Sequence, residues 1–216
     1  MLIVSLATEL NQVRRMMTKT RLALLSTLAD MHTQPIQYNL AALANILAKV
    51  APDLLYVEVP QQDWELGRLE QAPVEVQRSL LPLAELSRTV VVPVAPDTRQ
   101  FNDFAPRTGW RARLVRWLDQ ALRWMQRQAN SAEAIHAWPF AGACHTLCHL
   151  SQWSWDAESR RAWEEQNQGM LDNIRQAIRR DPNCRILVAV QCQRTHWLAS
   201  RFKKLPDLEF VDYREL

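Results

Sequence analysis

Short apolar segments alternate with helix-forming segments along this chain, and that alternation limits the possible fold more than any other feature. Residues 21–28 form an apolar run that suits a strand buried on both faces. Residues 36–50 repeat apolar side chains at helical spacing, and residues 54–59 are again strand-like. A strand, a helix and a second strand within about 40 residues predict a βαβ unit, which requires a parallel strand pair.

The same alternation returns farther along the chain. Residues 74–86 predict a helix and residues 89–94 a strand, in which Pro93 indicates a sheet edge or a strand end. Further helices are predicted at residues 110–128, 140–152, 157–180 and 195–204, and further strands at 185–191 and 208–212. We therefore expect an α/β fold, with a mostly parallel sheet, flanking helices and a helical insertion at about 108–180 before the late strand. Residues 1–20 are expected to be an N-terminal extension and residues 21–216 a single domain.

The composition excludes several classes of protein. The chain has 216 residues, 48% of them hydrophobic and 23% charged, as in ordinary globular proteins. Its four cysteines are too few and too irregularly spaced for the disulfide framework of a secreted domain. The N-terminus lacks the features of a signal peptide, and no apolar stretch reaches the ~18–20 residues that span a bilayer. We therefore expect a cytoplasmic protein without a transmembrane segment.

Charge and glycine content restrict the expected partners. The formal net charge of +3 is too small to imply a nucleic-acid partner, and none is expected. Only four glycines occur and none follows a predicted strand, so neither a dinucleotide fingerprint nor a Walker loop can form. A small molecule or a peptide is left as the expected ligand.

Three polar residues follow the first two predicted strands. Asp30 and His32 come just after the first strand, and Glu58 lies near the end of the second. If these strands are adjacent and parallel, the three side chains meet at one rim of the sheet and line one pocket. A carboxylate and an imidazole there suit proton transfer or a divalent metal. The alternative is that Asp30 caps the loop and Glu58 pairs with a surface base.

Two helical segments carry unusual side chains. Cysteines and histidines recur four residues apart in residues 144–149, which can supply two zinc ligands, although we interpret these cysteines as buried core residues. The helix at 110–128 carries tryptophans beside five arginines, a combination that also occurs in proteins that bind anionic membranes or single-stranded nucleic acid. Its apolar stripe is interpreted as core or as the contact of a homo-oligomer; it consists of Trp110, Leu114, Trp117, Leu118, Ala121, Trp124 and Met125.

The order of these features resembles the superfamily of erythromycin esterases, TraB/Tiki proteins and ChaN haem-binding proteins. Its members resemble one another in a Gly-x-x-His after the first strand, a Glu after the second, and a second Gly-x-x-His after a late strand. The corresponding segments here are residues 29–32 (Ala-Asp-Met-His), 51–58 (ending in Glu) and 191–194 (Gln-Cys-Gln-Arg). Many members carry Arg-Asn and a Met on the preceding long helix, where this chain has Gln166, Asn167 and Met170.

The resemblance implies one of two functions. The first is a metal-assisted hydrolase with His32, Glu58 and Asp30 as catalytic residues and Arg194 and Asn167 as substrate-binding residues. In this hydrolase, His196 would take the place of the histidine that the second Gly-x-x-His motif lacks here, and it would bind the metal together with His32. The alternative is that His196 only packs against the start of its helix. The second is a non-catalytic binding protein of the same fold for a ligand or for haem. The cofactor is not identified, and a divalent metal is expected ahead of haem.

Overall fold

In the part of the chain that the structure describes, the sheet has five parallel strands. The computed structural model describes residues 19–96 and 108–216, so residues 1–18 of the predicted extension lie outside the described residues. The strands are β1 (Thr20–Thr27), β2 (Leu54–Pro60), β3 (Val90–Ala95), β4 (Arg185–Gln191) and β5 (Leu208–Phe210). Their order is β3-β2-β4-β1-β5, and every described pair is parallel. The α/β prediction is confirmed, and β3, the strand with Pro93, lies at an edge.

Strand β4 lies between β1 and β2. Ile186 of β4 is in register with Leu22 of β1 on one side and with Leu54 of β2 on the other. The expectation that the first two strands are adjacent is therefore wrong. The late strand, which follows the helical insertion, occupies the central position and brings its own carboxyl end between the other two.

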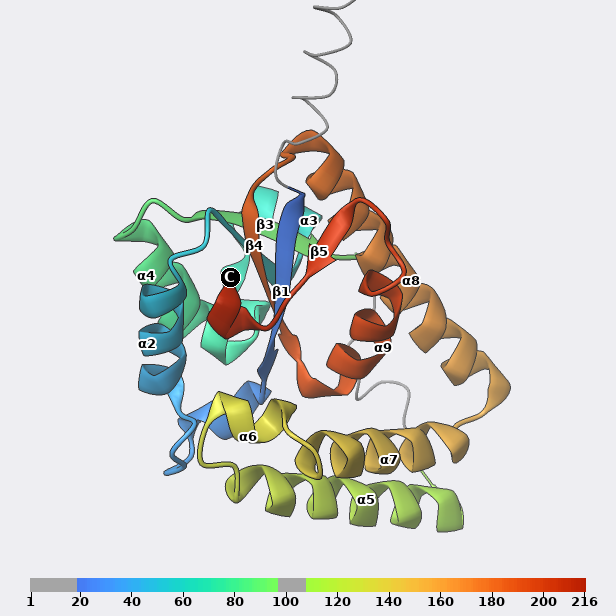
Figure 1. The fold of residues 1–216 in the computed structure, drawn as a ribbon. Helices are drawn as coiled ribbons and strands as arrows, with labels where there is room; N and C mark the ends of the chain where they lie inside the picture. Colours follow the sequence, from blue (N-terminus) through green and yellow to red (C-terminus); the bar gives the residue numbers. More distant parts are fainter. Residues whose placement is uncertain (1–18, 97–107) are drawn as a thin grey trace, which may run out of the picture.

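Helices cover both faces of the sheet (Figure 1). One face carries α2 (Leu40–Val50) and α4 (Leu81–Glu85), and the other carries α8 (Ala157–Arg180) and α9 (Cys192–Phe202). The short segments are α3 (Gln61–Glu65), the 3-10 turns η1 (Ala29–Thr33), η2 (Leu69–Gln71) and η5 (Tyr213–Glu215), and the π turn η3 (Val76–Leu80). The helix predicted at 74–86 is confirmed: residues 74–85 are helical throughout, with the π turn η3 in the middle and Pro82 near the start of α4.

Alternate strand residues feed two separate cores. Leu25, Leu55 and Leu187 point into the core beneath α2 and α4. Leu24 and Val188 point into the core beneath α8 and α9. Both faces of the central strands are therefore apolar, which is why their sequences are continuous apolar runs rather than alternating ones.

The helical insertion covers the carboxyl ends of the strands. It contains α5 (Gly109–Arg127), α6 (Ala132–His136) and α7 (Phe140–Trp153), and α5 and α7 lie side by side below the sheet in Figure 1. Ligands of open α/β sheets bind outside the carboxyl ends of the strands. The helices of this insertion therefore cover the expected ligand site.

Candidate functional site

A cavity of about 440 Å³ lies at the carboxyl ends of β1, β2 and β4, bounded on one side by α5. This volume is within the usual range for small-molecule sites. Amides and carboxylates dominate the polar part of its described lining. The polar lining residues are Asp30, Glu58, Asp63, Gln71, Asp119, Arg123, Gln126, Gln166, Gln191, Gln193 and Arg194.

A buried ion pair forms one wall of this cavity. The Arg194 Nε donates to Glu58 Oε1 at 2.6 Å, and only 5% and 10% of the two side chains are exposed. The second carboxylate oxygen of Glu58 accepts the backbone N–H of Gln191 at 3.1 Å. Both oxygens of Glu58 therefore accept a hydrogen bond, and the carboxylate, which also lines the cavity, is the ion-pair partner of Arg194.

Helix α8 completes the environment of the guanidinium. Arg194 donates through Nη1 to Asn167 Oδ1 and through Nη2 to Gln166 Oε1, both at 2.7 Å. Its planar group also lies over the ring of Trp163, 4.3 Å from the centroid. Asn167 is fully buried and donates in turn to the Trp163 carbonyl, so it positions Arg194 and does not reach the cavity. The prediction that Asn167 binds substrate is wrong for this reason, whereas Arg194 does line the cavity.

Two departures from the resembled family are in direct contact. Gln166 stands where the family carries an Arg, and Arg194 stands where it carries the second histidine. Arg194 of α9 donates to Gln166 of α8, so a guanidinium contacts the position at which the resemblance expects one. No imidazole stands at residue 194, where the hydrolase hypothesis expects one.

A second ion pair connects the loop after β1 with helix α5. Asp30 follows β1, and its carboxylate accepts from Arg123 Nη1 of α5 at 2.9 Å. Asp119, one turn earlier on α5, accepts from Arg123 Nε at 3.0 Å, as its spacing predicts. Asp30 is largely exposed, and its ion pair with Arg123 links the loop after β1 to α5. To transfer a proton, Asp30 would first have to separate from Arg123.

His32 is buried and is not among the described residues that line this cavity. Its Nε2 accepts the backbone N–H of Leu28, and its Nδ1 donates to the carbonyl of Tyr38, both at 2.8 Å. Both ring nitrogens are used, and His32 is not part of the described cavity lining. The prediction that His32 shares a pocket with Glu58 is therefore wrong, and this geometry gives no support to a catalytic or metal-binding role for His32. Its imidazole instead pins the loop after β1, in which Ala29 has a φ of 51°, the left-handed region that a glycine favours.

We expect the His32 ring to stay neutral through most of the acidic range. Burial lowers its pKa from 6.5 to about 4, against the opposing effect of its bond to Tyr38. Titration of the ring followed by NMR should give a midpoint near that value, with the neutral ring above it in the Nδ1–H tautomer. His32→Gln assigns the signal. A midpoint close to 6.5 would contradict the buried placement.

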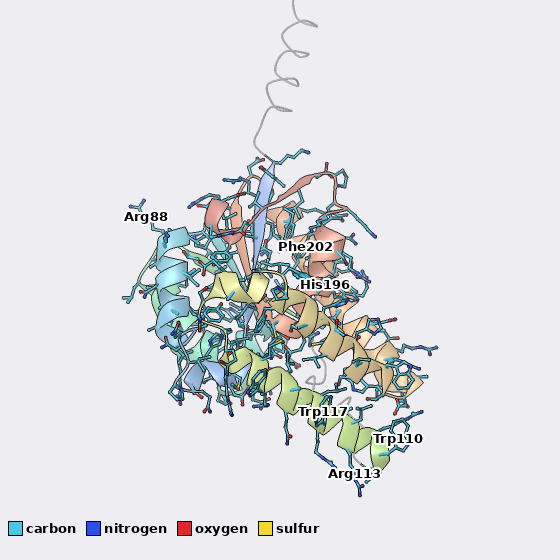
Figure 2. The ribbon with its side chains drawn as sticks, turned by 60° about the horizontal axis from the view of Figure 1, so that its bottom comes forward. Arg88, Trp110, Arg113, Trp117, His196 and Phe202 are labelled. Atoms are coloured by element: carbon cyan, nitrogen blue, oxygen red, sulfur yellow. The ribbon has the colours of Figure 1, made fainter. Side chains whose placement is uncertain are left out.

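His196 belongs to a different cavity. Its ring stacks on His145 of α7, with 3.8 Å between centroids, in a pocket of about 460 Å³ that also contains Cys144 and Cys192 (Figure 2 labels His196). The reason is helical geometry: α9 begins at Cys192, and residues two apart on a helix point about 200° apart. Arg194 faces the first cavity, so His196 cannot. The prediction that it joins His32 at a metal is wrong.

The described residues do not fit a metal or haem in the first cavity. Among residues 19–96 and 108–216, no three His, Cys, Asp or Glu side chains are arranged to hold a metal ion. The described lining of the first cavity contains no histidine that could ligate a haem iron. Cys144 and Cys148 are buried free thiols, in agreement with their interpretation as core residues.

Glu75 is a buried carboxyl group that sequence reasoning missed. Its Oε1 accepts from Thr27 at the end of β1, and its buried Oε2 has no hydrogen-bond partner in the described part of the chain. Burial raises its pKa to about 7, and the charges of Glu58 and Asp30 act in the same direction. The preceding residues 72–74 line the first cavity, so Glu75 lies directly behind its wall. No local pattern marks it, because its burial arises from tertiary packing.

Comparisons with models of known protein families, with curated proteins and with solved structures found no match for this chain. The superfamily resemblance therefore stays a prediction. In the part of the chain that the structure describes, no helix has both the length and the apolar character needed to cross a bilayer.

Proposed function

We propose that this protein binds a small polar molecule, neutral or cationic, in the cavity at the strand carboxyl ends, without hydrolysing it. The observation that supports this most is the buried network in which Arg194 holds Glu58, Gln166 and Asn167. It occupies the position at which the resemblance expects a hydrolytic pair, and together with the backbone N–H of Gln191 it binds both oxygens of the carboxylate. A site built this way is rigid and suited to recognition.

The charge of the cavity supports the ligand class. The described lining contains four carboxylates and two guanidiniums, and each guanidinium already contacts a carboxylate. Arg68, which does not line the cavity, pairs with Asp63, so the four carboxylates face three guanidiniums and one negative charge is in excess. An anionic ligand would meet this charge without an uncommitted cation among the described lining residues. Carboxylates accept hydrogen bonds, and glutamine amides both donate and accept. Hydroxyl, amide and ammonium groups on the ligand are the matching partners.

Ligand screening by thermal shift and calorimetry tests the proposal. Neutral polyols, sugars, nucleosides and small amines should include binders that raise the melting temperature, and matched phosphates and carboxylates should not. Gln191→Leu, at the carboxyl end of β4, should weaken binding about tenfold by removing one amide from the wall. Gln168→Leu, on the exposed side of α8, is the matched control and should leave affinity unchanged.

Hydrolysis is the outcome that would overturn the proposal. The protein should be assayed on ester, amide and short-peptide substrates with added divalent metals. Turnover that disappears in Glu58→Gln would restore the hydrolase hypothesis. Binding confined to anionic ligands would contradict the proposed ligand class.

A further inference from the structure

The outward face of α5 is aromatic. Trp110, Trp117 and Trp124 are 62%, 62% and 65% exposed. They are spaced seven residues apart, and a seven-residue repeat drifts by only about 20° around a helix, so all three lie in one stripe. Figure 2, in which this side comes forward, shows Trp110 and Trp117 along α5 at the edge of the molecule.

These tryptophans are not needed for the fold. The buried side of α5 is formed by Ala112, Leu118, Leu122 and Gln126, and α5 packs against α7. Of the two interpretations of the stripe, core or homo-oligomer contact, core holds for Leu118 but not for the three exposed tryptophans, and the oligomer contact stays a prediction. Exposure of three large indoles on one helix is unusual for a solvated surface and marks an interaction site.

The same face is cationic. Arg113 and Arg127 each follow a tryptophan of the stripe by three residues, and Arg116 directly precedes another; all three arginines are exposed. The only acidic residue of α5 is Asp119, which lies about 180° around the helix from Trp110 and is paired with Arg123. The stripe is therefore flanked by positive charge with no carboxylate of α5 beside it.

This charge distribution selects among the possible partners. In a twofold dimer the same patch meets itself, so a second copy would bring arginines against arginines. Single-stranded nucleic acid needs a basic groove that follows the phosphates, whereas α5 is an outer helix of the molecule (Figure 1). A bilayer with anionic lipids offers a flat negative surface and an interfacial layer that favours indole rings.

We propose that the Trp–Arg face of α5, formed by Trp110, Arg113, Arg116, Trp117, Trp124 and Arg127, binds the surface of an anionic phospholipid bilayer. The indoles enter the headgroup layer while the guanidiniums contact lipid phosphates. The helix lies along the surface. The neighbouring helix α7 also has exposed apolar side chains, Leu150 and Trp153.

The test is co-sedimentation of the whole protein with vesicles. We expect binding to vesicles of phosphatidylcholine and phosphatidylglycerol in equal amounts, weak binding to phosphatidylcholine alone, and weaker binding at high salt. The triple variant Trp110→Ala/Trp117→Ala/Trp124→Ala should lose at least about tenfold in affinity. Arg113→Glu/Arg127→Glu should lose a similar factor. Arg88→Glu, which Figure 2 shows on the far side of the molecule, is the control and should bind as the wild type does.

Several results would overturn the proposal. Since all three tryptophans are exposed, the triple variant should keep the wild-type melting temperature, which circular dichroism verifies. Equal binding by the wild type and the folded triple variant would exclude this face. A dimer that dissociates in the triple variant, with no vesicle binding, would assign the face to a second copy. Binding to single-stranded oligonucleotides but not to vesicles would assign it to nucleic acid.

Discussion

Replacing Arg194 by Met should lower the free energy of unfolding by about 3–5 kcal/mol, the usual cost of removing one partner from a buried ion pair. The substitution leaves Glu58 in an environment where only 10% of its side chain is exposed, without its counter-charge. It also removes the donor that Asn167 Oδ1 and Gln166 Oε1 accept from, and the stacking on Trp163. Urea unfolding followed by circular dichroism measures the loss.

Two further variants separate the ion pair from general damage. Glu58→Gln/Arg194→Met removes both charges, so it should be less destabilised than the sum of the single variants, with a coupling energy of about 2 kcal/mol. Arg175→Met breaks the exposed pair with Asp172 on α8 and should cost less than about 1 kcal/mol. A loss as small as this for Arg194→Met would show that the network does not hold the site together.

Replacing Glu75 by Gln should raise the free energy of unfolding at pH 8 by roughly 2 kcal/mol. The pKa of this carboxyl is about 7 in the folded protein and 4.5 in its ordinary state. Between these values the folded chain binds a proton that the unfolded chain does not, so stability falls as the pH rises from 4.5 to 7. Above pH 7 the buried carboxyl is charged, and burying that charge costs roughly 3 kcal/mol of folding free energy. The Gln side chain avoids this cost, but its own buried amide lacks a partner, and this reduces the gain in stability.

The measurement compares the two proteins at each pH. His32 acts in the opposite sense, because its lowered pKa makes stability fall as the pH drops from 6.5 to about 4. Wild type and Glu75→Gln share this contribution, so their difference isolates Glu75. The difference should be near zero or slightly negative at pH 5 and positive at pH 8. Glu85→Gln, on the exposed side of α4, should show no such pH dependence. A difference that does not change with pH would mean that Glu75 is solvated.

The sequence by itself determined which segments are strands and which are helices. The apolar runs at 21–28, 54–59 and 185–191 became central strands because both faces of the sheet are covered by helices, and such strands need no polar side. Pro93 placed β3 at an edge for a local reason, since it cannot donate to a second neighbour.

Only the tertiary structure decided the order of the strands and the direction of the polar side chains. Parallel strands can be joined by crossovers in more than one order, so periodicity did not reveal that β4 separates β1 from β2. His32 was predicted at the right rim but turns inward, because two backbone groups of its own loop satisfy its ring. Arg194 of α9 pairs with Glu58 of β2, which is far from it in the sequence. Glu75 is likewise buried against a distant segment, the end of β1 at Thr27. Local patterns record which residues an element contains, whereas burial and pairing depend on which distant elements pack around them.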